Sequence, residues 1–186
     1  MSNKQEAKLR ALERLILAHI TFRQVIAACE FLISHDSDEH AQFYGTFFSG
    51  ICVSYMRPFM SAERLGRLPA GYGTFSNNPD HAGTHEDLKN GRNWACAHNS
   101  PDQAAGLLAN TQQQEEQKRI RFVFDGQRIT FHPPEVTWPK SRLHAIVSLC
   151  RFQIEHVERD VDDLLKNLCE GKTYKQGEYI IGETFP

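Results

Sequence analysis

The sequence predicts a mainly α fold: an antiparallel four- to five-helix bundle with one inserted β-hairpin at about residues 118–132. Three observations lead to this prediction. Apolar residues recur every three or four positions over several long stretches, which is typical of amphipathic helices. The links between some of these stretches are short, which favours antiparallel neighbours. One further segment alternates apolar and polar residues around an Asp-Gly pair, which is typical of a hairpin.

Length and composition predict a single domain over residues 1–186. The chain has 186 residues, of which 40% are hydrophobic and 24% are charged, as in ordinary globular proteins. Chains of this length usually form one core, because splitting into domains begins near about 250 residues. The formal net charge of −2 excludes an overall positive field, so contact with a nucleic acid would need a local basic patch.

The same features predict a soluble, cytoplasmic protein that does not associate with a membrane. The first residues lead directly into a charged amphipathic pattern, without the apolar region of an export signal, and no uncharged run approaches the ~18 apolar residues of a membrane span. The cysteines are odd in number, widely spaced and without a C-x-x-C pair, so neither a disulfide framework nor a zinc cage is indicated. We expect most of them to be buried thiols: Cys29, Cys52, Cys96, Cys150 and Cys169.

The first two helices are expected at about residues 4–34 and 37–57. Asp36 can cap the second helix, and Glu39, three residues later, can complete a capping box. Pro58 ends that helix, because the residue before a proline disfavours helical geometry. Since the link between the two helices is short, they should be antiparallel neighbours.

A long surface loop is expected at residues 60–80, where helical periodicity is lost and Gly, Pro, Ser and Asn gather. Loops of this length within compact domains are often functional. A third helix follows at about 81–98, with Leu88 and Ala95 facing the core. Gly91 lies in its middle and costs about 1 kcal/mol relative to alanine, which indicates close backbone packing.

A β-hairpin is expected at residues 119–132, with Asp125 and Gly126 as a two-residue turn. Pairing across this turn gives one apolar face, formed by Ile120, Phe122, Phe124, Ile129 and Phe131. The opposite face carries Arg119, Arg121, Arg128 and His132. The three arginines are candidate ligands for phosphate groups, although a solvated strand face is the alternative interpretation.

The last long helix is expected at about 141–169, followed by an extended tail at 170–186. Its apolar residues, from Leu143 to Leu168, are spaced alternately four and three apart. Such a seam suits left-handed packing within a helical bundle. Ser100 and Pro101 can begin one more short helix between the third helix and the hairpin.

The strongest candidate for chemistry is the segment from Arg92 to His98, at the end of the third helix. An arginine followed by asparagine, with a histidine a few positions later, resembles the motif of the HEPN superfamily of helical bundles. Arg92, Asn93 and His98 match this motif. A bundle of four or five helices with the motif near the end of an inner helix is also what the resemblance implies.

The resemblance implies a metal-independent endoribonuclease that needs no cofactor, of the kind used in toxin–antitoxin and phage-defence systems. His98 would act as the base that takes the proton of a ribose 2′-hydroxyl. Arg92 would stabilise the charge that builds on the phosphate oxygens, and Asn93 would orient the histidine or the phosphate. The implied products are a 2′,3′-cyclic phosphate and a 5′-hydroxyl. The implied partners are RNA, a second copy in a homodimer, and an antitoxin or other protein.

Helix geometry limits this hypothesis, because six residues rotate two side chains by about 120° around a helix axis. The length of arginine, fraying of the helix near His98, or two motifs meeting across a dimer axis would close this gap. A purely structural role is the alternative: Arg92 would cover a helix end through a salt bridge, and His98 would favour the negative end of the helix dipole. A non-catalytic module that binds a nucleotide, RNA or a protein is the other alternative.

Two further sets of residues are weaker candidates. His81 and His85 are four residues apart, the spacing of two metal ligands on a helix. No third ligand follows at a defined spacing, so no metal site is predicted, and the Glu-x-x-His pairs of a di-iron centre are absent. Tyr55 and Arg57, near the end of the second helix, could flank the motif or be a core tyrosine and a surface ion pair.

Overall fold

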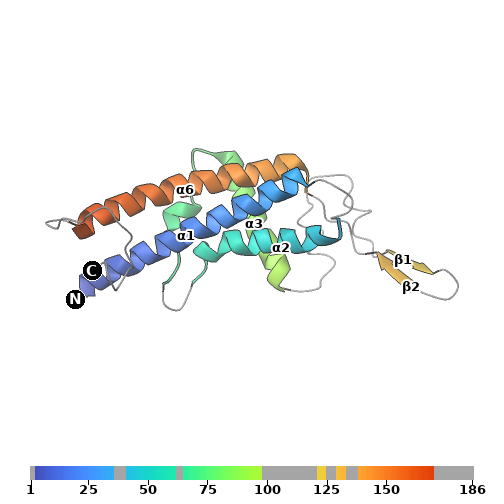
Figure 1. Cartoon of the computed structure of the whole chain (residues 1–186), viewed down its shortest axis with the longest axis horizontal. Helices are drawn as coiled ribbons and strands as arrows, with labels where there is room; N and C mark the ends of the chain where they lie inside the picture. Colours follow the sequence, from blue (N-terminus) through green and yellow to red (C-terminus); the bar gives the residue numbers. More distant parts are fainter. Residues whose placement is uncertain are drawn as a thin grey trace.

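The computed structural model describes residues 3–35, 41–61, 65–97, 121–124, 129–132 and 138–169 (Figure 1). The side chains of residues 4, 41–45, 94–97, 121–124, 129–132 and 169 are outside this description. As predicted, the described part is mainly helical. The elements are α1 (Asn3–Ser34), α2 (Ala41–Met56), η2 (Arg57–Phe59), η3 (Ala70–Gly73), α3 (Pro79–Ala97), β1 (Arg121–Phe124), β2 (Ile129–His132) and α6 (Lys140–Cys169).

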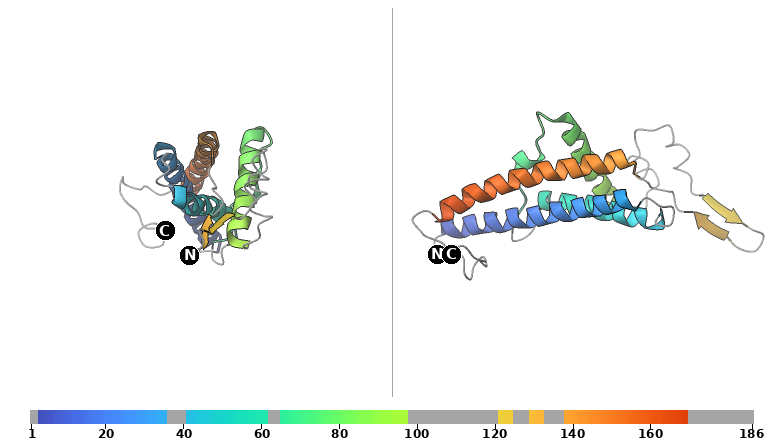
Figure 2. Two further views of the ribbon diagram at one scale, coloured as in Figure 1. Left: turned by 90° about the vertical axis from the view of Figure 1, so that its right-hand side faces the viewer. Right: turned by 45° about the horizontal axis from the view of Figure 1, so that its top comes forward.

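The two longest helices, α1 and α6, lie side by side and run in opposite directions (Figures 1 and 2). Near the start of α1, Leu9 and Leu12 pack with Leu168 from the end of α6. Further along, one face of each helix is buried in a shared apolar core. The buried residues of this seam include Leu15, Phe22, Val25 and Cys29 on α1, and Leu143, Val147, Cys150 and Val157 on α6.

Helices α2 and α3 complete the core. The rings of Phe22, Tyr55 and Phe59 pack together, with centroids 5.4 to 6.1 Å apart, and join α1 to the end of α2. In the middle of α2, Phe48 packs edge-on against Trp138, with ring centroids 4.1 Å apart. Helix α3 crosses the other helices at a steep angle, as the end-on view shows (Figure 2).

The segment between α2 and α3 differs from the surface loop expected at residues 60–80. Within its described part, Leu68, Tyr72 and Phe75 are buried in the core. The backbone carbonyl of Tyr72 accepts a hydrogen bond of 2.8 Å from Nε2 of the fully buried Gln153 on α6. The segment therefore packs against α6 as a part of the fold, although its Gly-Pro-rich composition is typical of a surface loop.

The strands β1 and β2 pair in antiparallel fashion, with Phe122 opposite Phe131 and Phe124 opposite Ile129. This register differs from the predicted two-residue turn, which would place Phe124 opposite Gln127. Residues 125–128 therefore separate the paired residues. Because the shift is by an even number of residues, the pairs still join apolar with apolar positions.

Helix α1 is long and apolar enough to cross a membrane, judged by length and composition over Gln5–Ser34, and it is the one such helix among the described residues. The sequence pattern predicts no helix of this kind. It is nevertheless found because apolar side chains lie on two faces of α1, of which only one face packs in the core. A core helix of a soluble protein can pass the same test, so α1 alone does not assign a location.

Replacing Phe22 with alanine should destabilise the fold strongly. Phe22 is fully buried and contacts both Tyr55 and Phe59, and removing such a ring leaves a cavity that typically costs about 3–5 kcal/mol. Urea denaturation measures the free energy of unfolding. Met60→Ala is the control, because Met60 is a large apolar residue with 38% of its surface exposed. Equal losses in the two variants would contradict the described core.

Candidate functional site

Helix α3 carries the candidate site, and its first turn shows why it begins where it does. Pro79 occupies the first helical position, and Oδ1 of Asn78 accepts a hydrogen bond of 3.1 Å from the backbone N–H of His81. Asparagine is a favoured cap and proline a favoured first residue. The helix therefore starts two residues before the predicted boundary and is regular from there to Ala97.

Arg92 and Asn93 lie near the end of this regular helix. Arg92 is half-buried and Asn93 is exposed, and Nη1 of Arg92 donates a hydrogen bond of 3.2 Å to Oδ1 of Asn93. The neighbouring cation on α3, Lys89, is paired with Glu86 at 2.7 Å. Among the described residues no carboxylate pairs with Arg92, so the salt bridge required by the structural alternative is not found there.

The third residue of the motif, His98, lies outside the described residues. Helix α3 is intact up to Ala97, so fraying between Arg92 and Ala97 does not remove the 120° offset. The reach of the arginine, fraying at His98 itself and a second motif across a dimer axis all stay predictions. Of the arginines proposed for the hairpin, Arg119 and Arg128 also lie outside the described residues. Arg121 lies opposite His132 in the strand register.

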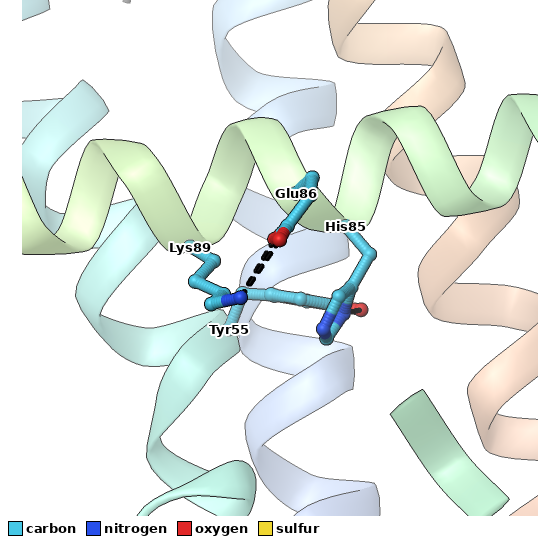
Figure 3. A network of polar contacts seen from close by, with 4 residues as sticks. All are labelled: Tyr55, His85, Glu86 and Lys89. Carbon is cyan, nitrogen blue, oxygen red and sulfur yellow. Dashed lines mark hydrogen bonds and ion pairs between the residues drawn. The ribbon is translucent and has the colours of Figure 1, made fainter. Parts of the chain in front are cut away.

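The structure joins two candidates that the sequence analysis considered separately. Tyr55, from α2, is fully buried, and its hydroxyl lies 2.9 Å from Nδ1 of His85 on α3 (Figure 3). Glu86 and Lys89 form their ion pair on the same stretch of α3. Arg57, by contrast, is exposed in η2. Tyr55 therefore lies in the core, as one of the two interpretations of its sequence position predicts, and its hydroxyl contacts His85.

The surroundings of His85 favour its neutral form. Its ring packs against Phe59 and Phe75, with centroids 4.9 and 5.2 Å away. Burial lowers the pKa of His85 below its usual value of 6.5, the charge of Glu86 acts in the opposite direction, and Lys89 lowers it further. Burial also raises the pKa of Tyr55 well above 10.0, so the tyrosine keeps its proton. A neutral His85 whose Nδ1 accepts from Tyr55 carries its proton on Nε2.

The two histidines on α3 do not share a metal site with other described residues. Nδ1 of His85 is bonded to Tyr55, and Nε2 of His81 lies 3.2 Å from the hydroxyl of Ser148. Within the ranges that the structure describes, no three His, Cys, Asp or Glu side chains gather in a way that could hold a metal ion.

Three of the five cysteines are buried thiols, as expected: Cys29, Cys52 and Cys150. Burial raises the pKa of Cys29 and of Cys52 to about 12. A thiol with so high a pKa is not a nucleophile near neutral pH, because the thiolate is the reactive form. The side chains of Cys96 and Cys169 are outside the described part.

Comparison with known proteins identifies no relative. The chain matches no protein-family model, no curated protein and no solved structure. The resemblance to the HEPN superfamily therefore rests on the residues of the motif and on the order of the helices.

Replacing His85 with glutamine should weaken the pH dependence of stability. The unfolded histidine titrates near 6.5, whereas native His85 titrates lower. Between these two values the unfolded state binds more protons, so the free energy of unfolding falls as the pH is lowered through this window. Urea denaturation at about pH 7.5 and 5.0 should show a smaller difference in His85→Gln than in the unsubstituted chain.

The exposed His144 on α6 provides the control for this comparison. His144→Gln makes the same substitution away from the aromatic rings that pack on His85, so it should not reproduce the effect of His85→Gln. A proton NMR titration that places the pKa of His85 at or above 6.5 would refute the burial argument.

Proposed function

We propose that this chain is a HEPN-like, metal-independent endoribonuclease that uses Arg92, Asn93 and His98. The observation that supports this proposal most strongly is the setting of Arg92. Its guanidinium is half-buried, is bonded to Asn93, and pairs with no carboxylate among the described residues. A guanidinium in this state keeps its capacity to bind two phosphate oxygens at once.

Two other arginines of the described part pair with carboxylates, whereas the half-buried Arg14, like Arg92, is bonded to a neutral oxygen, the carbonyl of Leu65. Arg142 pairs with Asp87, and Arg151 pairs with Glu30. The hydrogen bond to Asn93 involves one N–H group of the guanidinium, so its other N–H groups can bind an anionic ligand. A phosphodiester is the anion that the resemblance implies.

In the proposed reaction, His98 takes the proton of a ribose 2′-hydroxyl, and the oxygen attacks the adjacent phosphorus. The bond from phosphorus to the 5′-oxygen breaks, and that oxygen takes a proton from a water molecule to become a 5′-hydroxyl, while His98 returns the proton that it took to the solvent. Arg92 stabilises the charge on the phosphate oxygens. Asn93 holds the guanidinium through its Oδ1, while its amide N–H groups remain to bind a phosphate oxygen. The other product is a 2′,3′-cyclic phosphate.

We also propose four further properties of this chain. These are a four- to five-helix bundle in which the hairpin at about 118–132 is an insertion, a cytoplasmic location, a homodimer, and an antitoxin-like protein partner. The second candidate function is binding of another molecule without catalysis. The large apolar side chains exposed along α1, such as Leu17 and Ile20, support this alternative.

Arg92→Ala and His98→Ala should each lower RNA cleavage in the presence of EDTA by about 100-fold or more, because each removes a group that acts in the transition state. Arg92→Lys should retain only part of the activity, since lysine keeps the charge but not the two-point contact. Cleavage of a labelled single-stranded RNA measures the rates. Arg10→Ala is the control, because Arg10 is an exposed arginine paired with Glu6. Undiminished cleavage by both alanine variants would rule the proposal out.

A further inference from the structure

Helix α1 carries a row of apolar side chains on the side opposite its buried face. Four large residues are well exposed: Ile16 at 37%, Leu17 and Ile20 at 46%, and Phe31 at 42%. At about 100° per residue they lie roughly opposite Phe22, Val25 and Cys29, which point into the core. Three of them, with two other exposed residues, form a strip that we call the outer α1 seam: Leu17, Ile20, Gln24, Ala27 and Phe31.

The position of α1 leaves this seam accessible to another molecule. In the end-on view α1 lies at the margin of the described helices, with α6 and α2 beside it (Figure 2). Phe31 is held in place by stacked rings, with Phe47 at 5.5 Å and His35 at 4.2 Å between centroids. A contiguous exposed apolar strip with a fixed aromatic ring is typical of an interaction surface.

We propose that the outer α1 seam binds a second copy of this chain, with the two α1 helices antiparallel and a two-fold axis at Gln24. The seam residues are spaced three, four, three and four apart. This is the spacing by which one helix packs against another along a narrow stripe. The inference does not depend on the proposed ribonuclease activity, because no seam residue belongs to the α3 motif. The interface is also distinct from a dimer axis at that motif, since α1 and α3 lie on opposite sides of the described helices (Figure 2).

The seam is complementary to itself, as a two-fold interface requires. Leu17 and Phe31 each lie seven residues from Gln24, on opposite sides. In an antiparallel pair centred on Gln24, Leu17 of one copy therefore faces Phe31 of the other, twice. The two Gln24 side chains meet at the axis, where each amide can donate to and accept from its copy.

Charge favours the antiparallel orientation. Glu13 continues the line of the seam toward the N-terminus, and an antiparallel pair keeps the two Glu13 carboxylates far apart. A parallel pair would instead bring the two Glu13 carboxylates together, which is unfavourable. The two Arg23 side chains approach each other in the antiparallel pair, but arginine at an exposed position is long enough to turn away.

Charge also favours a second copy over a membrane surface. Helices that lie on membranes carry lysine and arginine on the polar side of their apolar face. The borders of the outer α1 seam carry both signs, with Arg23 and Glu30 on one side and Glu13 at its end. In addition, the opposite face of α1 is packed against α6, so insertion across a membrane would require the core to open.

The proposal predicts that the full chain forms dimers whose fraction rises with concentration in sedimentation velocity. Leu17→Glu combined with Ile20→Glu should yield monomers at every concentration, with an unchanged circular dichroism spectrum, since both sites are exposed. Met60→Glu is the matched control, because Met60 is 38% exposed but lies outside α1, and it should dimerise normally. A monomeric unsubstituted chain, or a dimer unaffected by the double substitution, would overturn the proposal.

Cysteine cross-linking tests the axis and the orientation. Gln24→Cys should form a disulfide-linked dimer under mild oxidation. Leu17→Cys combined with Phe31→Cys should also cross-link, whereas either substitution alone should not, and the unsubstituted chain is the control for native thiols. Cross-linking by Leu17→Cys alone, with none by the pair, would overturn the antiparallel arrangement. Co-sedimentation of a monomeric chain with phosphatidylcholine–phosphatidylserine vesicles, lost in the double glutamate variant, would assign the seam to a membrane instead.

Discussion

The packing of α1 against α6 is the contact on which the rest of the structure depends. The two helices, of 32 and 30 residues, bury one face each along an apolar seam that runs from Leu9 and Leu168 to the far end of the core. Isolated helices are marginal in water, and most of their stability comes from such tertiary packing. The shorter α2 and α3 then pack on a frame that α1 and α6 have formed.

Two polar contacts, one buried and one partly buried, position the elements that pack against α1 and α6. Gln153 donates to the carbonyl of Tyr72 and holds the segment before α3, while Tyr55 and His85 join α2 to α3. Buried hydrogen bonds add little net stability but are costly to break, so they select one arrangement. They thereby set the position of α3, and with it the place where Arg92 and Asn93 meet solvent.

The helices could be predicted because their apolar residues keep a period near 3.6 over many turns. The burial of Leu68, Tyr72 and Phe75 could not, since those residues stand among glycines and prolines that indicate a loop. The contact between Tyr55 and His85 joins residues 30 positions apart and leaves no local pattern. The exposed apolar strip on the outer face of α1 could not be predicted either. Apolar residues on both faces of α1 recur every three or four positions, so the sequence pattern alone does not separate the buried face from the exposed one. In the candidate site, the sequence indicated Arg92 and Asn93. That no carboxylate of the described part pairs with Arg92 could be seen only in the structure, because such pairs join residues far apart in the sequence.

Cleavage of an RNA phosphodiester bound at Arg92 is the central proposal, and the chemical nature of the new RNA ends tests it most directly. Purified protein is incubated with single-stranded RNA in EDTA, and the new termini are identified by mass spectrometry. The account predicts fragments that end in a 2′,3′-cyclic phosphate and begin with a 5′-hydroxyl, because the attacking oxygen is the ribose 2′-hydroxyl. Intact RNA, or fragments with a 3′-hydroxyl and a 5′-phosphate, would contradict it.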